Sequence, residues 1–153
     1  MGSSVSAKEV VEEVAKDQAF YRRSGGGVTL SGGELLMQPE FSSEILRLCK
    51  ERNIGTAIET SGYSSKKDFM KVLKYVDFVI YDIKHMNPDI HKDWVGVNNE
   101  IILENLKIIP RNTAVMIRIP IIPGFNDSDE NITETALFVK QIGNVQKLEL
   151  LPY

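Results

Sequence analysis

The sequence has a single cysteine, no long run of basic residues and no long apolar segment. The lone Cys49 excludes an internal disulfide, and it excludes a metal or cluster site built from several cysteines of this chain. The net charge of -3, without a lysine or arginine run, disfavours nucleic acid as a partner. No stretch approaches the roughly 20 apolar residues of a membrane helix, so no membrane partner is expected.

The ends and the interior of the chain also lack features that would divide it. The first residues have no basic and apolar leader pattern, so we expect a cytoplasmic protein. Residues 1–5 are interpreted as a remnant of a cloning vector or a disordered start. No low-complexity linker follows, and residues 6–153 are predicted to form one domain, long enough to bury a core.

Helical and strand-like patterns alternate along the chain. Ser6 and Glu9 have the spacing of a capping box, which predicts a first helix running to about Phe20. Cys49 lies on the apolar face of another predicted helix, and we expect a buried, structural thiol. Strands are predicted at 28–31, 55–60, 78–83, 114–119 and 147–151, with helices beginning near 39, 66, 102 and 129 and a short helical turn at 88–94.

This order predicts an α/β fold with a parallel sheet. One helix followed by five strands, separated by four helices, indicates repeated βαβ units. Five strands are too few for a closed eight-stranded barrel. A partial (βα) barrel, or an open sheet, is therefore the predicted architecture.

Ionisable residues follow the apolar part of four predicted strands, and this is the most informative pattern in the chain. These residues are Glu34, Glu59, Asp82, Lys84 and Arg118. Buried parallel strands are apolar, and charged residues are rarely buried without a partner, so charges at the carboxyl end of such a strand indicate a partner or a ligand. That end of a (βα) barrel is where ligands bind. A rim of three carboxylates and two cations suits a ligand that carries both an ammonium and a carboxylate group.

Each of these positions also has a simpler interpretation. The glycine-rich segment 25–34 could form two tight loops or cradle a phosphate, although it lacks the Lys-Ser/Thr ending of an ATP-binding loop. Asp82 and Lys84 could form an ion pair at a strand end, and Arg118 could pair with Glu59 or Asp82 rather than with a ligand. His85 is as consistent with a surface residue as with a ligand contact. For His91 and Trp94 local packing is favoured.

Five segments in order resemble those of the activating enzymes of glycyl radical enzymes. They read GGGVTLSGGE (25–34), IETSGY (58–63), YDIKHM (81–86), IRIPIIPGFN (117–126) and LELLPY (148–153). This family consists of radical S-adenosylmethionine proteins and is typified by pyruvate formate-lyase activating enzyme. The likeness extends over nearly the whole chain, from about residue 6.

The resemblance implies a (βα)6 barrel, of which this chain would supply about five strands, together with a [4Fe-4S] cluster and S-adenosylmethionine. It implies reductive cleavage of that cofactor, with flavodoxin or ferredoxin as electron donor, to place a radical on a glycine of a partner such as pyruvate formate-lyase. A Gly-Gly-Glu motif of the family contacts the methionine amino group, and an Asp-x-Lys motif belongs to the same site. Glu59 matches a position near a monovalent cation, and Arg118 matches one near the cofactor carboxylate. The implied cofactor residues are Gly32, Gly33, Glu34, Glu59, Asp82, Ile83, Lys84 and Arg118.

The chain also departs from the family. It has no Cys-x3-Cys-x2-Cys loop, and no metal ligand is predicted in it. We therefore expect an internal piece of an activating enzyme that is inactive alone, and that has an unpaired sheet edge through which it could dimerise. The alternatives are a truncated paralogue that only binds a partner and a barrel enzyme for a phosphorylated substrate. The acidic rim disfavours the latter, because carboxylates repel phosphate.

Overall fold

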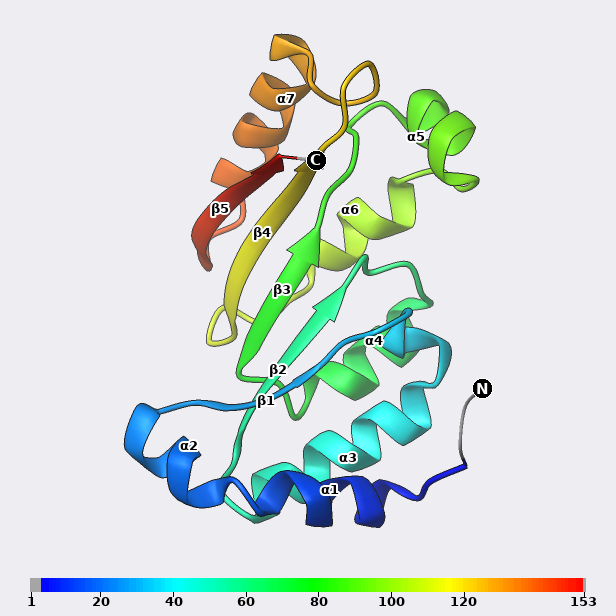
Figure 1. Cartoon of the computed structure of the whole chain (residues 1–153). Helices are drawn as coiled ribbons and strands as arrows, with labels where there is room; N and C mark the ends of the chain where they lie inside the picture. The colour runs from blue at the N-terminus through cyan, green and yellow to red at the C-terminus, as the bar shows by residue number, and fades with distance from the viewer. Residues whose placement is uncertain (1–3, 153) are drawn as a thin grey trace.

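A computed structural model describes residues 4–152 of the chain. One sheet of five parallel strands, in the order β1-β2-β3-β4-β5, runs through the molecule (Figure 1). Each strand therefore pairs with its neighbours in sequence, which is the arrangement of a barrel that has been opened. The strands are β1 Gly27–Leu30, β2 Gly55–Thr60, β3 Phe78–Asp82, β4 Ala114–Ile121 and β5 Val145–Pro152. The predicted α/β class and partial barrel are confirmed.

The helices begin where side chains can cap them. Ser65 and Ser128 each accept a hydrogen bond from the backbone of the first helical turn, and Pro39 and Pro88 occupy first-turn positions that need no donor. The predicted helical turn at 88–94 is a full helix. The helices are α1 Ala7–Ala15, α2 Gln18–Ser24, α3 Pro39–Glu51, α4 Lys66–Leu73, α5 Pro88–Val95, α6 Glu100–Lys107 and α7 Asp129–Lys140, with a 3-10 helix η1 at Leu35–Met37.

The prediction of one helix from Ser6 to Phe20 is wrong in its second half. The capping box of Ser6 and Glu9 is present, but α1 stops at Ala15 and a separate helix α2 starts at Gln18. At the break, the Lys16 N–H donates to the Glu13 carbonyl oxygen, three residues earlier rather than the four of an α-helix. The Gln18 side chain then donates to the Arg52 carbonyl oxygen at 2.6 Å, and this long-range bond fixes the new direction of the chain.

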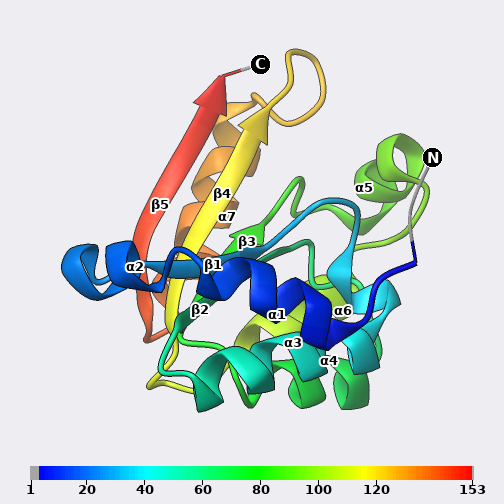
Figure 2. The ribbon, with the colours of Figure 1, turned by 60° about the horizontal axis from the view of Figure 1, so that its bottom comes forward.

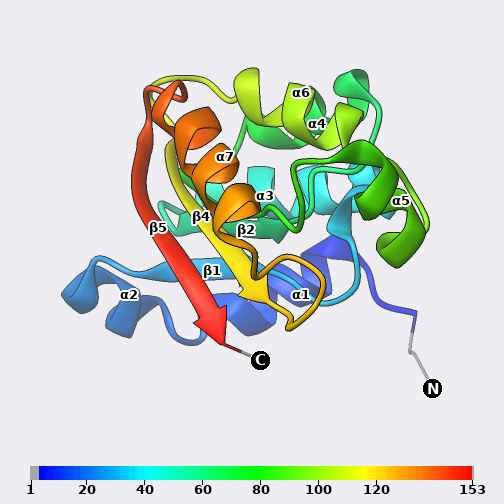
Figure 3. The ribbon, with the colours of Figure 1, turned by 90° about the horizontal axis from the view of Figure 1, so that it is seen from above.

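Within the described residues, helices cover one face of the sheet and leave the other open. Ile58, Tyr81 and Ile117 point into a core shared with Phe69 of α4 and Leu106 of α6, and all five are fully buried. Figure 3 shows α4, α6 and α7 on this side of the strands. Residues that alternate with them, such as Glu59, Asp82 and Arg118, point to the opposite, uncovered face. A site that needs water-accessible charges can therefore form on that face.

A smaller apolar cluster joins α1 to α3 beside the first strand. Figure 2 shows these two helices next to each other. Val11, Ile45, Cys49 and Ile54 form its centre and are at most 3% exposed. Burial raises the pKa of the Cys49 thiol, an effect that the nearby Arg52 charge partly offsets. The predicted role of Cys49 as a buried structural thiol is confirmed.

Within residues 4–152, none of the helices combines the length and the apolar character required to span a bilayer.

Candidate functional site

A pocket of about 370 Å³ lies at the carboxyl ends of β1, β2 and β3. Six of the eight predicted site residues line it, although they come from three separate segments, the loop after β1, the end of β2 and the end of β3 with the residues that follow it. The remaining two lie beside it, Arg118 as an ion-pair partner and Ile83 between two lining residues. The six lining residues are Gly32, Gly33, Glu34, Glu59, Asp82 and Lys84.

The glycine turn presents Glu34 to the loop that follows β2. Gly32 and Gly33 have φ angles of 88° and 60°, a backbone conformation that side chains disfavour. Glu34 Oε1 accepts hydrogen bonds from Thr60 Oγ1 at 2.7 Å and from the Leu36 N–H at 3.2 Å. Its Oε2 accepts from the Ser61 N–H at 3.0 Å and from Ser61 Oγ at 2.7 Å. The three donors from Thr60 and Ser61 join the ends of β1 and β2 through one carboxylate, and the Leu36 N–H fixes that carboxylate locally.

Arg118 lies between two carboxylates on the open face of the sheet. Its guanidinium donates to Glu59 Oε1, and its Nε and one terminal nitrogen each lie 3.2 Å from Asp82 Oδ1. The register that pairs Asp82 with Arg118 on the adjacent strand produces this contact. Of the two interpretations of Arg118, the structure contains the salt bridges, and with both partners at once.

The same contacts shift the pKa of Glu59 and the pKa of Arg118. The hydrogen bond from Arg118 is the main reason that the pKa of Glu59 is lowered; burial opposes it, and a bond of 3.0 Å from Ser31 Oγ adds to it. Burial disfavours the charged form of Arg118, but bonding to Glu59 and the charge of Asp82 outweigh burial and raise the pKa of the guanidinium. Both side chains are therefore charged at neutral pH.

Asp82 and Lys84 keep bonding capacity that the rest of the described chain does not use. Only Oδ1 of Asp82 contacts Arg118, and no group within residues 4–152 bonds to Oδ2 or to the Lys84 ammonium. Ile83 between them is 1% exposed and packs in the main core, which fixes the backbone from which both side chains project. The pocket thus presents one available carboxylate oxygen and one available cation.

The histidines and the tryptophan have different surroundings. His85 is only 6% exposed, so the surface interpretation is wrong. Burial lowers the pKa of His85, and its Nδ1 accepts the Asn87 N–H at 2.9 Å. His91 is buried and its ring contacts the Val97 carbonyl oxygen at 2.6 Å. Local packing is therefore confirmed for His91. The Trp94 ring stacks on Phe125 at 4.9 Å, but the residue is 57% exposed, so packing accounts for only part of its surface.

Sequence reasoning did not single out the residues that hold the rim together. Asn105 is 2% exposed on α6 and donates to the carbonyl oxygens of Gly62 and Ser64 at 2.8 and 2.9 Å. A side chain at Gly62 would lie 1.7 Å from the Tyr81 hydroxyl, so only glycine fits. The available signal was an asparagine on the apolar face of α6, where a hydrophobic residue is expected.

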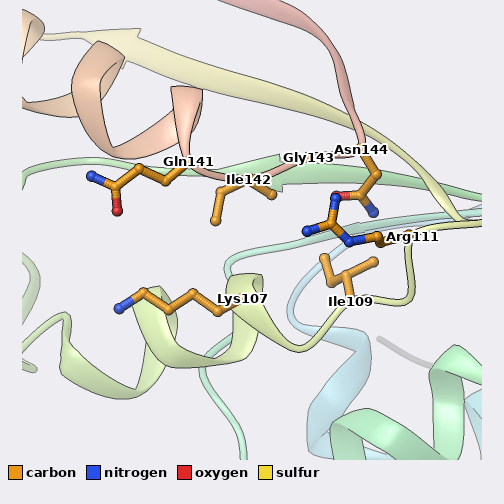
Figure 4. Close-up of a pocket in the computed structure, with 7 residues that line it drawn as sticks. All are labelled: Lys107, Ile109, Arg111, Gln141, Ile142, Gly143 and Asn144. Atoms are coloured by element: carbon orange, nitrogen blue, oxygen red, sulfur yellow. The ribbon is translucent and has the colours of Figure 1, made fainter.

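A second cavity, of about 170 Å³, lies at the other end of the sheet (Figure 4). It contains no carboxylate, and its two cations lie far apart in it, with Arg111 beside Gly143 and Lys107 at the opposite end. Lys107 lies in the last turn of α6, where a cation suits the helix dipole, and its Nζ is 5.4 Å from the Phe138 ring centre. These contacts account for both the position and the charge of Lys107, and the first pocket remains the candidate site.

The sequence pattern of the radical SAM superfamily matches residues 2–136 of this chain. The chain belongs to the radical SAM superfamily. A crystal structure of a domain of pyruvate-formate lyase-activating enzyme from Bacteroides vulgatus superposes with a TM-score of 0.76 at 34% identity, over 84% of this chain and 81% of that one. Streptococcus suis SuiB, at 17% identity, covers 99% of this chain with a TM-score of 0.78 but only 34% of SuiB, and shows the fold alone.

Curated relatives are activating enzymes of several different enzymes. The chain is 44% identical to the (2S)-3-sulfopropanediol dehydratase activating enzyme of Klebsiella oxytoca, over 99% of this chain and 49% of the relative. It is 43% identical to the pyruvate formate-lyase-activating enzyme of Clostridium pasteurianum, over 99% and 64%. The chain spans about half the length of several of these relatives. The predicted resemblance is confirmed.

The superfamily implies S-adenosylmethionine and a [4Fe-4S] cluster, and the residues present fit only the first. Cys49 is the one cysteine, and it is buried between α1 and α3, away from the pocket. Among residues 4–152, no group of three cysteine, histidine or acidic side chains is placed to hold a metal. The pocket itself combines carboxylates and a cation, which suits an amino acid end group.

Proposed function

We propose that this chain forms the S-adenosylmethionine-binding part of an activating enzyme for a glycyl radical enzyme. The observation that carries the proposal is the unused pair of opposite charges in the pocket, Asp82 Oδ2 and the Lys84 ammonium. A free amino acid end group presents an ammonium and a carboxylate a few ångströms apart. The membership in the radical SAM superfamily supports the choice of this cofactor among amino acid ligands.

The charge balance of the site supports a cationic ligand. Glu34, Glu59 and Asp82 carry three negative charges, and Lys84 and Arg118 carry two positive ones, which leaves a net charge of -1. S-adenosylmethionine has a net charge of +1, because its sulfonium adds to a neutral amino acid group. A phosphorylated ligand would meet a net repulsion at the same place, so this balance disfavours the alternative of a phosphate cradle.

We assign the end groups of the ligand by charge. Lys84 would bind the carboxylate and Asp82 Oδ2 would accept from the ammonium. Gly32 and Gly33 would let the ligand approach the backbone, while Glu34 would meet the ammonium after exchanging one of its donors, since Thr60 and Ser61 already occupy both its oxygens. Glu59 and Arg118 would hold the geometry of Asp82 through their ion pairs and line the site, and Ile83 would contribute through its fixed backbone.

The reaction requires more than this chain supplies. When bound, S-adenosylmethionine supplies the 5′-deoxyadenosyl group that takes a hydrogen atom from a glycine of the partner. The chain described here does not have the cysteines for the cluster, so we propose that they belong to the rest of a longer parent protein and that this part is inactive alone. We propose a partner of the pyruvate formate-lyase type and flavodoxin or ferredoxin as the reductant.

The decisive experiment uses the full-length parent. After anaerobic reconstitution of its cluster and reduction, we expect cleavage of S-adenosylmethionine to methionine and 5′-deoxyadenosine, measured by liquid chromatography. The 153-residue chain, treated in the same way, should give none. Absence of cleavage by a parent with a fully loaded cluster would overturn the proposed activity. A parent gene without three cysteines upstream of this segment would instead favour the truncated paralogue that only binds a partner.

A second experiment tests the ligand on this chain by NMR titration, which detects millimolar affinities. We expect S-adenosylmethionine to shift the signals of the pocket residues, and S-adenosylhomocysteine, which lacks the sulfonium charge, to bind several-fold more weakly. Inorganic phosphate should cause no shift there. Saturable phosphate binding at the pocket would overturn the assignment of the ligand.

A further inference from the structure

Buried asparagine side chains hold the chain where it leaves β3 toward α5. Asn99 donates to the carbonyl oxygens of His85 and Met86, both at 2.7 Å. The Met86 N–H in turn donates to Asn131 Oδ1 at 2.9 Å. The asparagines are at most 3% exposed, and this segment has no helix or strand partner to satisfy its polar groups.

Asn126 makes the connection that bears on the candidate site. Its Nδ2 donates to the Lys84 carbonyl oxygen at 2.7 Å and to the Pro120 carbonyl oxygen at 2.8 Å. Its Oδ1 accepts the Ile122 N–H at 2.7 Å, so all the side-chain hydrogen-bonding groups of this fully buried residue are used. Figure 1 shows the two segments that it joins, the loop after β3 and the loop after β4, at the same end of the sheet.

These bonds determine where the Lys84 side chain can point. On one side of Lys84, Ile83 is anchored in the core, and its N–H donates to the Arg118 carbonyl oxygen at 3.0 Å. On the other side, the Lys84 carbonyl is held by Asn126. With the backbone fixed on both sides, the Cα–Cβ bond has one direction, and the side chain lines the pocket.

We infer that Asn126 is a positioning residue that directs the Lys84 side chain into the pocket. It also fixes the separation between the ends of β3 and β4, and therefore the separation between the Asp82–Lys84 pair and Arg118. This inference rests on the proposed function for the identity of the ligand. The geometric part, that the Asn126 amide sets the position of Lys84, can be tested without any ligand.

The chain provides a matched control in Asn144. Its Nδ2 also donates to two carbonyl oxygens, those of Pro110 at 2.9 Å and Thr113 at 2.7 Å, but at the amino end of β4. Asn126→Asp and Asn144→Asp each replace an amide that donates twice by a carboxylate that donates to neither carbonyl. Both should lower the melting temperature, and only the first should affect the site.

The test has a ligand-free readout and a binding readout, both on the full chain. Lys84 acylation by an amine-reactive reagent, followed by peptide mass spectrometry, should change at least threefold in rate in Asn126→Asp and less than 1.5-fold in Asn144→Asp. The affinity for S-adenosylmethionine should fall about tenfold in the first variant and remain unchanged in the second. Wild-type Lys84 reactivity and affinity in Asn126→Asp, or equal losses in both variants, would overturn the inference.

A measurement on the unaltered chain covers the case in which Asn126→Asp does not fold. Hydrogen exchange of the Ile122 and Met86 amides, which donate to Asn126 and Asn131, should slow at least threefold when S-adenosylmethionine is added. The Val115 amide, which donates to the backbone carbonyl oxygen of Asn144, serves as the control, and its exchange rate should not change. Equal protection of all three amides would contradict the inference. If the unaltered chain does not bind the cofactor, the proposed function fails, while the Lys84 acylation rates still decide the role of Asn126.

Discussion

Strand β3 has an aspartate at each end, and the two are used differently. Asp77 precedes the strand, and both of its oxygens are engaged: Oδ1 by Lys50 Nζ at 2.6 Å, and Oδ2 by the N–H and hydroxyl of Thr56 at 3.0 and 3.1 Å. Asp82 ends the strand and contacts Arg118 through Oδ1 alone. The Asp77 carboxylate joins β3 to β2 and α3. The Asp82 carboxylate has one oxygen, Oδ2, to which no group within residues 4–152 bonds.

The difference extends to other residues near each end of the sheet. At the amino end, Asp77 pairs with Lys50 and Lys107 lies where a helix dipole suits it, while Arg111 has no ion-pair partner among residues 4–152. At the carboxyl end, backbone that belongs to no helix or strand is bound by asparagines, while Asp82 and Lys84 project into the pocket. Within residues 4–152, the pocket at the carboxyl end is thus the one that combines a carboxylate oxygen and a cation that folding leaves without partners.

The largest loss of stability is expected from a substitution of Gly62, at the carboxyl end of the sheet. Gly62→Ala places a methyl group 1.7 Å from the Tyr81 hydroxyl at a φ of 73°, and overpacking with backbone strain should cost about 3 kcal/mol. Tyr81 cannot move easily, because it is buried and donates to the Ile102 carbonyl oxygen at 2.6 Å. Thermal unfolding should show a fall in melting temperature of roughly 10 °C.

Gly143→Ala is the control at the amino end. Its added methyl group would meet the Arg111 side chain at 2.2 Å, but an exposed arginine can swing away, so the change should stay within about 0.5 kcal/mol. Equal losses in both variants would mean that the carboxyl-end loop is no more tightly constrained than the other end.

A smaller effect should separate the two aspartates. Asp82→Asn should lower the affinity for S-adenosylmethionine about tenfold, or roughly 1.4 kcal/mol, because an amide cannot replace a charged acceptor for an ammonium. Lys84→Met should do the same for the ligand carboxylate. NMR titration measures both affinities, and melting temperatures establish that the variants are folded.

Asp77→Asn is the matched variant for this comparison. It should cost about 1 kcal/mol of stability, since it weakens hydrogen bonds from Lys50 and Thr56, and it should leave the affinity unchanged. A loss of affinity in Asp77→Asn as large as in Asp82→Asn would show that the two ends of β3 are coupled, contrary to the comparison above.

The smallest effect is a pH dependence that both ends should share. Burial disfavours ionisation of Asp77, but hydrogen bonds from Lys50 and Thr56 outweigh it, and the pKa of Asp77 is lowered, as is that of Glu59 beside Arg118. A carboxyl with a lowered pKa stabilises the fold above its unfolded pKa of about 4, and this contribution is lost as the pH falls through the folded pKa.

Melting temperatures measured from pH 6 down to pH 3 should therefore fall most steeply below about pH 4. Asp77→Asn and Glu59→Gln should each make the slope shallower, with neutral pH as the internal control. An unchanged slope in Glu59→Gln would indicate that its ion pair with Arg118 does not contribute in solution, as is common for partly exposed pairs.

The sequence was sufficient for most of the fold because the signals were local. Serine caps before α4 and α7, Pro39 at the start of α3 and the apolar run of β3 predicted these elements within a few residues. It failed at the break between α1 and α2, which depends on a hydrogen bond from Gln18 to Arg52, far along the chain. Long-range contacts of this kind leave no local pattern.

For the site, the sequence by itself determined the kinds of charge and the end of the sheet, because residues at the carboxyl ends of parallel strands must lie at one edge. Only the tertiary structure decided which charges remain available. The strand register placed Arg118 against Glu59 and Asp82, and the packing of α6, α7 and the loop after β4 brought Asn99, Asn126 and Asn131 to the segment that carries Lys84. The physical reason is that a hydrogen bond between distant residues depends on where the folded chain places them, whereas charge and periodicity can be read residue by residue.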